Sequence, residues 1–235
     1  MSSKIENFDV VAKGYPIIYP HELIISTKGD ERRKDFKLRK HYDVHQGKTL
    51  DDFAQKHRGG FGLTEHLFFE AARCVKTYKT RDPYVLLDSI NAVTIISYAY
   101  PADGQKGYCA VLNKIKYAVI NGNLDEHYQR IAAGHEAAHL ILHYDQIIKM
   151  HMLRDFDLFG SAGRLERQAN FFLADFLITD EHITDILSYD DIGYNSLASS
   201  LYIPKALLCF KLHSMQQRGY NVKLPEGLDS RFLGK

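Results

Sequence analysis

The chain of 235 residues has no tryptophan, six prolines and three cysteines. The cysteines, Cys74, Cys109 and Cys209, are odd in number and widely spaced, which excludes a disulfide framework and a cysteine-based zinc knuckle. We expect them to be small buried residues in a reducing compartment. No apolar run approaches the roughly 20 residues that a membrane span needs. The N-terminus also lacks the basic start and apolar core of a secretory signal. We therefore predict a cytoplasmic protein without membrane contact.

The chain also lacks an excess of charge of either sign, because its formal net charge is only +1. Such a balance gives no general attraction to nucleic acid or to a membrane surface. A basic cluster lies within residues 32–40, but acidic residues stand beside and inside it, including Glu31 and Asp35. We interpret residues 1–60 as a charged, solvated N-terminal arm and do not predict nucleic-acid binding. Residues 61–235 then form the main domain.

Helix signals come first in that domain. After the glycine-rich break at 58–62, Thr64 resembles an N-cap for an amphipathic helix, and Asp82 resembles the cap of a second helix with Pro83 at its first position. Three strand candidates follow at 92–100, 107–113 and 116–122. Lys114 and Ile115 separate the last two, so we expect a hairpin there.

The second half of the chain is predicted to be helical. A long helix covers 124–144, another covers 164–178, and shorter ones lie near 180–187, 190–201 and 204–217. Strands grouped together and followed by helices are typical of the α+β class. We predict an α+β domain in which a small antiparallel sheet packs on a helical core, with further helices at the C-terminus.

The most informative stretch is GHEAAHLILHYD, residues 134–145. Residues four apart on a helix lie on one face, about 6 Å apart along the axis, so His135 and His139 can bind one zinc ion together. Glu136 is rotated by about 100° and can accept a proton from a zinc-activated water. The small Ala137 and Ala138 allow another element to pack closely. The alternative is a pair of hydrogen-bonded core histidines with no metal.

A zinc peptidase site needs a third protein ligand. His143 lies on the same face, but about 12 Å along the axis from His135, which is too far for one ion on a straight helix. Glu166, on the following helix, is the better candidate, and Asn170 lies one turn later on the same face. We predict Glu166 as the third ligand. Asn170 and His143 are predicted to support the ligands by hydrogen bonds rather than to bind the ion.

Two stretches in order, KGYCAVLNKIKYAVINGNLDEHYQRIAAGHEAAHLILH and LERQANFFLADFLI, resemble the ImmA/IrrE metallopeptidases. The resemblance covers roughly residues 82–217 and implies a zincin-like core. It implies zinc bound by His135, His139 and Glu166, with Glu136 as the general base. Ala137 and Ala138 stand where the family usually has Leu-Gly, and Thr179-Asp180 where it has Met-Pro. No expected ligand or base is lost through these differences.

The resemblance further implies a zinc endopeptidase that makes limited cuts in a regulatory protein, typically a helix-turn-helix repressor of a mobile element or a stress response. The alternative function is a zinc-binding regulatory module that binds a repressor without cutting it. Nitrogen and oxygen ligands would also accept manganese or iron. The sequence leaves the oligomeric state open, and it does not choose among five candidate donors for the oxyanion: Tyr144, His151, His182, Tyr202 and His213.

Overall fold

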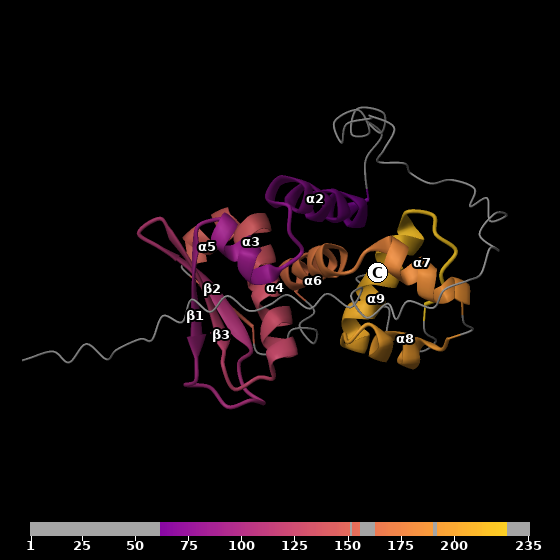
Figure 1. Cartoon of the computed structure of the whole chain (residues 1–235). Coiled ribbons are helices and arrows are strands. Elements are labelled where there is room, and N and C mark those ends of the chain that lie inside the picture. The colour runs from indigo at the N-terminus through magenta and orange to yellow at the C-terminus, as the bar shows by residue number, and fades with distance from the viewer. Residues whose placement is uncertain (1–61, 151, 156–162, 190–191, 225–235) are drawn as a thin grey trace, which may run out of the picture. The chain divides into compact units, whose positions relative to one another are not determined.

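The computed structural model describes residues 62–150, 152–155, 163–189 and 192–224. The predicted arm over residues 1–60 lies outside the described residues. The elements occur in the order α2 (Leu63–Tyr78), α3 (Pro83–Ser89), β1 (Ala92–Ser97), β2 (Gly107–Leu112), β3 (Ile115–Asn121), α4 (Glu126–Leu142), α5 (Tyr144–Met150), β4 (Met152–Asp155), α6 (Arg164–Leu177), α7 (Asp180–Tyr189), α8 (Tyr194–Ser200) and α9 (Lys205–Gln217) (Figure 1). This order confirms the predicted α+β class.

The four strands form one sheet in the order β1-β3-β2-β4. β2 is antiparallel to both β3 and β4, but β1 pairs with β3 in parallel. The prediction of a purely antiparallel sheet was therefore wrong. The loop between β1 and β2 leaves room for one strand between them in the sheet. β3 occupies that position and runs parallel to β1. Asn121, at the end of β3, holds this loop by donating hydrogen bonds to the carbonyls of Pro101 at 2.8 Å and Gln105 at 2.9 Å.

β4 was not predicted at all. Its four residues, MLRD, are too few to show an alternating pattern, and they are a strand only because they pair with β2. The predicted hairpin between β2 and β3 is confirmed, with its turn one residue earlier than expected. Asn113 and Lys114 form the turn, and both have positive φ, 51° and 67°. This is the type I′ geometry whose twist matches that of the flanking strands.

Of the two predicted helix starts, one is confirmed. The Asp82 carboxylate accepts hydrogen bonds from the backbone N–H groups of Tyr84 and Val85, and Pro83 occupies the first turn. The other was wrong, because α2 begins at Leu63 with Gly62 as its N-cap, which places Thr64 inside the helix. Glycine is an acceptable N-cap residue, so the helix begins before the threonine.

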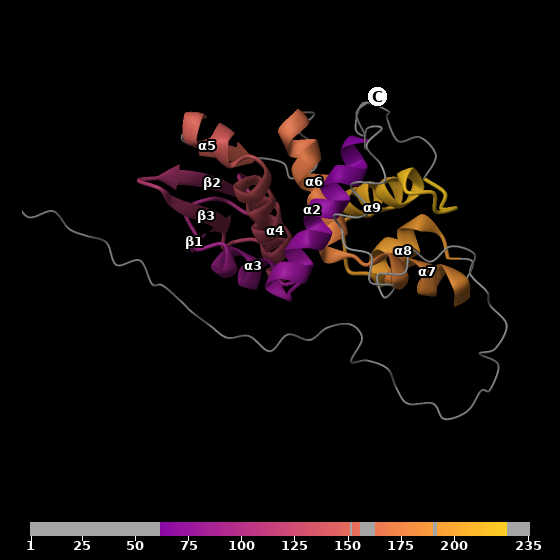
Figure 2. The same cartoon turned by 90° about the horizontal axis from the view of Figure 1, so that it is seen from above.

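Helix α4 lies between the sheet and α6, as both cartoon views show (Figures 1 and 2). Small residues permit this close packing on two sides. Ala137 and Ala138 are fully buried. A Cβ added at Gly134 would lie only 2.5 Å from the Cδ1 atom of Leu173 on α6. The residues that carry the HEAAH motif are therefore inside the protein.

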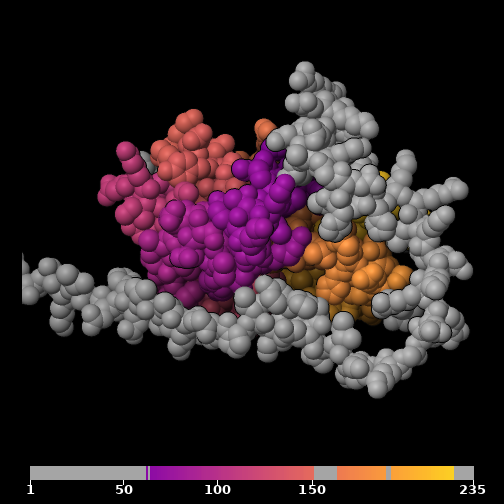
Figure 3. Space-filling view, turned by 45° about the horizontal axis from the view of Figure 1, so that its top comes forward, coloured from indigo at the N-terminus to yellow at the C-terminus, as the bar shows by residue number. Residues whose placement is uncertain are grey.

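Helix α6 also packs against α2 and α9, and α2 and α9 contact each other. In Figure 3 the indigo surface of α2 adjoins the orange surface of the C-terminal helices. All three cysteines are buried, as predicted. Among the described residues, no helix combines the length and the apolar character that crossing a membrane requires.

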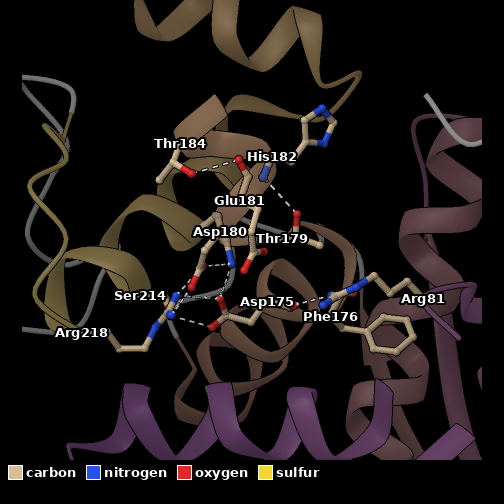
Figure 4. A network of polar contacts seen from close by, with 11 residues as sticks. Arg81, Asp175, Phe176, Thr179, Asp180, Glu181, His182, Thr184, Ser214 and Arg218 are labelled. Atoms are coloured by element: carbon tan, nitrogen blue, oxygen red, sulfur yellow. Dashed lines mark hydrogen bonds and ion pairs between the residues drawn. The ribbon is translucent and has the colours of Figure 1, made fainter. Parts of the chain in front are cut away.

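A buried ionic network joins the C-terminal end of α6 to α7 and α9. Lys211 donates to Asp175 at 2.8 Å and approaches Asp180 at 2.7 Å, while Arg218 donates to Asp180. Ser214 donates to the second oxygen of Asp175 at 2.6 Å. Figure 4 shows Asp175, Asp180, Ser214 and Arg218 turned toward one another. This network attaches the last helices to the core.

Candidate metal centre

His135 and His139 lie on one face of α4, in consecutive turns. Their ring centroids are 4.7 Å apart, and their Nε2 atoms are 3.0 Å apart. Both side chains are buried at the contact between α4 and α6. The helical spacing of four residues thus places the two ring nitrogens next to each other.

Glu166 reaches this pair from the first turn of α6. Its Oε2 atom lies 3.0 Å from the Nε2 atom of His135 and 3.3 Å from that of His139. Tetrahedral ligands at 2.0–2.1 Å from zinc are separated from one another by about 3.3 Å. The three separations observed here, 3.0, 3.0 and 3.3 Å, therefore suit a zinc ion. This is a cluster of metal-ligand residues with ligand atoms within 4.8 Å of one another.

The outer nitrogen of His135 faces an amide. Its Nδ1 atom lies 3.0 Å from the Oδ1 atom of Asn170, one turn after Glu166 on α6. Because an amide oxygen only accepts hydrogen bonds, the imidazole carries its proton on Nδ1. The lone pair on Nε2 is then directed toward His139 and Glu166, which is the tautomer that binds a metal through Nε2.

A longer chain of contacts likewise fixes the proton of His139 on its Nδ1 atom. Gln168 Oε1 accepts from His143 Nε2 at 2.9 Å, so His143 presents an unprotonated Nδ1. That Nδ1 atom lies 3.0 Å from the Nδ1 atom of His139 and accepts a hydrogen bond from the N–H group at that position. Nε2 of His139 is left with its lone pair toward the cluster.

Sequence analysis missed Gln168. It lies two residues after Glu166, where helical spacing alone would place it on another face. Its contact with His143 spans 25 positions of the chain and depends on how α4 and α6 cross. No local signal in the sequence could have found it.

The charge states fit this arrangement. Burial lowers the pKa of His139 to about 4, and burial also lowers the pKa of His143, so both rings are neutral at pH 7. The cluster offers two imidazole nitrogens and one carboxylate oxygen, which is a donor set that zinc accepts.

Glu136 lies on the sheet side of the same helix and is 1% exposed. A Cβ atom built on Gly107 of β2 would lie 2.8 Å from Oε1 of Glu136 and 3.1 Å from the carbonyl oxygen of Val119. The backbone of β2 thus approaches the carboxylate at a position where only glycine leaves room. Sequence analysis did not single out Gly107, since its role depends on how closely the strand and α4 pack.

Cys109, two residues further along β2, also contacts Glu136. Burial, the charge of Glu136 and a hydrogen bond with that carboxylate raise the pKa of the Cys109 thiol well above its ordinary value. The thiol is therefore protonated and serves as a donor. Cys109 is buried, as predicted, but it also helps to position the carboxylate beside the cluster.

The five candidate oxyanion donors are dispersed. His151 lies outside the described residues. Tyr202 is 72% exposed, and His182 is also exposed. The ring of His213 packs against Phe171, and Tyr144 follows His143 at the start of α5. None of these contacts singles out one candidate.

Comparison with known proteins identifies the family. The model of the Peptidase_M78 family, described as the IrrE N-terminal-like domain, matches residues 97–213. A relative from Bacillus phage phi105, described as "Uncharacterized immunity region protein 2", is 30% identical over 125 residues, which are 53% of this chain and 74% of the relative. The chain belongs to the IrrE-like peptidase family.

The family match spans β2, β3, α4 and α6, so all six predicted site residues lie within it. The ImmA/IrrE resemblance seen in the sequence is therefore confirmed, and a metallopeptidase type of function follows from it. No solved structure matches the chain.

Proposed function

We propose that this protein is a zinc-dependent endopeptidase in which His135, His139 and Glu166 bind the metal. The observation that carries the proposal is the convergence of two imidazole nitrogens and one carboxylate oxygen at 3.0–3.3 Å. Membership of a peptidase family supports the same assignment. When bound, zinc supplies Lewis-acid chemistry that polarises a carbonyl group and acidifies water.

Glu136 is the general base in this proposal. Its carboxylate accepts a proton from the attacking water and delivers it to the leaving amine. Gly107 leaves the carboxylate room, and the Cys109 thiol hydrogen-bonds it from the sheet side. Asn170 and the pair His143–Gln168 fix the protons of the two ligand imidazoles on Nδ1, so that both Nε2 atoms are available to the metal.

The proposed substrate is a regulatory protein, in particular a helix-turn-helix repressor of a mobile element or stress response, cut at a limited number of bonds. The relative from phage phi105 supports this class, because its description assigns it to an immunity region. A cut in one regulatory protein would end repression in a single step.

The second candidate is a zinc-binding module that binds a repressor without cutting it. The same ligand cluster would serve it, and the buried position of Glu136 against β2 is what favours the enzyme. Burying a carboxylate costs free energy, and of the two functions only the enzyme uses this carboxylate in its chemistry. Replacing Glu136 therefore distinguishes the two functions.

Zinc content is the first measurement. The full-length chain, purified without chelator, should contain about one zinc per chain by elemental mass spectrometry. The variant His139→Ala/Glu166→Ala should contain none, while Glu136→Gln should keep it. A folded wild-type chain that contains no metal and refuses added zinc would exclude both proposed functions.

Cleavage is the second measurement. Wild type and Glu136→Gln are incubated with a peptide library and with a native cell lysate, and new N-termini are identified by mass spectrometry. Wild type should create internal cuts that Glu136→Gln does not. A zinc-loaded wild type that creates none, yet retains a protein from the lysate as firmly as Glu136→Gln does, would favour the binding module.

A further inference from the structure

A concave site lies at the C-terminal end of α4, where the lining residue Leu140 follows His139 in the chain. It is an open cavity of about 600 Å³, within the volume range of small-molecule sites. Four segments border it: the end of α2, the α3–β1 turn, the β2–β3 turn and the α4–α5 junction. Its lining residues are Tyr78, Ser89, Ile90, Asn91, Lys114, Lys116, Leu140, Ile141 and Tyr144. None of the proposed zinc ligands, nor Glu136, lines it.

The charge of this lining is entirely positive. Lys114 and Lys116 are its only charged residues, and no aspartate or glutamate lines the cavity. The Lys116 ammonium is fixed in place, because it donates to the carbonyl of Ile90 at 3.0 Å and lies 5.5 Å from the centre of the Tyr144 ring. A fixed ammonium keeps donors available to a second acceptor.

Lys114 adds an independent observation. It occupies the second position of the type I′ turn with φ 67°, where glycine is sterically favoured. A lysine at this position makes the turn less favourable, and this lysine lines the cavity. A second residue of the lining, Asn91, also has positive φ, 55°.

The rest of the lining suits a flat apolar group. Ile90 and Leu140 are buried and form an apolar base, and Tyr78 and Tyr144 contribute aromatic rings. Ser89 and Asn91 add polar groups at the side. A ligand that fits would combine an aromatic body with an anionic group facing the two ammoniums.

We propose that this cavity binds a small phosphate monoester with an aromatic body, of the class of nucleoside monophosphates. A phosphate monoester carries a charge of about −1.5 to −2 at neutral pH, which matches the two lysines. The phosphate faces Lys114 and Lys116, and the aromatic body lies over Ile90 and Leu140. This binding function is separate from peptide hydrolysis and does not depend on bound zinc.

The test uses the full-length chain with AMP, adenosine and inorganic phosphate as probes, in calorimetric titrations at low salt. AMP should bind at least tenfold more tightly than adenosine or inorganic phosphate. The variants Lys114→Gly and Lys116→Gln should each weaken AMP binding at least tenfold. Lys106→Gln is the matched control, because Lys106 lies at the opposite end of β2 and donates to Ala102, and it should bind AMP like wild type.

Lys114→Gly also distinguishes a loss of AMP binding from a loss of folding stability. Glycine favours the type I′ turn, so the thermal midpoint should not fall when AMP binding is lost. Absence of AMP binding to wild type would overturn the proposal. Equal binding of adenosine and AMP, or of inorganic phosphate and AMP, would overturn it too, as would equal weakening by Lys106→Gln and the two cavity variants.

Discussion

Helix α6 carries a buried polar cluster at each end, and the two clusters differ in how their charges are balanced. At the C-terminal end, the ionic network sets Asp175 and Asp180 against Lys211 and Arg218. At the N-terminal end, Glu166 faces the imidazoles of His135 and His139, and the ring of His139 is neutral at pH 7. Within the described part of the chain, Glu166 has no lysine or arginine partner.

The difference teaches what each cluster is for. Two carboxylates and two side-chain cations form a closed set that can stay buried on its own. Two imidazole nitrogens and a carboxylate that converge on one point form an open set, which a cation completes. Similar burial therefore accompanies a structural role at one end of α6 and a proposed chemical role at the other.

The largest expected effect removes one cation from the closed set. Lys211→Met should lower the free energy of unfolding by about 3–5 kcal/mol, because it leaves the two buried carboxylates with Arg218 as their one remaining side-chain cation. Chemical denaturation monitored by circular dichroism measures this. Lys205→Met, exposed on the same helix, is the control and should stay close to wild type. Equal stability of the two variants would show that the network is not balanced as described.

The next largest effect is that of acid on folding stability, which should distinguish the two clusters. Below about pH 6.5 the unfolded chain protonates His139, whereas the folded, metal-free chain does not until about pH 4. Stability is therefore fully present above pH 6.5 and falls as the pH drops toward 4, by roughly 3 kcal/mol from this residue. Denaturation of chelator-treated protein at a series of pH values measures the slope.

The variant His139→Gln is the control for this slope, because it has no imidazole to titrate. It should make the curve between pH 6.5 and 4 less steep, and the slope that remains comes from His143 and His127, whose pKa values burial also lowers. Asp180 of the ionic network contributes little in that window, because burial raises its pKa but Arg218 and Lys211 hold it well below its ordinary value. An unchanged slope in His139→Gln would contradict the assignment.

A third change tests the approach of β2 to the open cluster. Gly107→Ala places a Cβ atom against the carboxylate of Glu136. The carbonyl oxygen of Val119, on another side, prevents the new Cβ atom from moving away instead. The carboxylate must move, which should reduce kcat for peptide cleavage about 10²-fold while zinc content stays near wild type. Gly193→Ala is matched to it, because an added Cβ there meets nothing within 4 Å. Equal kcat for the two alanine variants would count against a positioning role of Gly107.

The smallest effects concern the residues behind the ligands. Gln168→Ala and Asn170→Ala should each weaken zinc binding about 10–100-fold. Each variant removes a hydrogen bond that holds one ligand imidazole in the tautomer that binds the metal. Competition titrations with a chromophoric chelator measure the affinity. Gln216→Ala, exposed on α9, should have no effect. If Gln168→Ala binds zinc like wild type, His143 fixes His139 without its help.

Much of the local structure followed from the sequence because it depends on neighbours in the chain. Spacing of four residues placed His135 and His139 on one helical face, Asp82 and Pro83 marked a helix start, and strand-forming residues separated by a short turn predicted the hairpin. Glu166 was predicted from its position on the following helix, one turn before Asn170, and from a family resemblance. The chain itself could not show how far its carboxylate lies from the imidazoles.

Tertiary structure decided the rest, because those features depend on contacts between distant segments. Pairing of β1 with β3 made the sheet mixed, and β4 is a strand only through β2. The crossing of α4 and α6 brought Gln168 to His143. A lysine of α9 became part of a buried ionic network because Asp175 and Asp180 lie opposite it. The sequence determined which side chains are present on each element, whereas packing determined which of them meet, since a contact needs both partners in place.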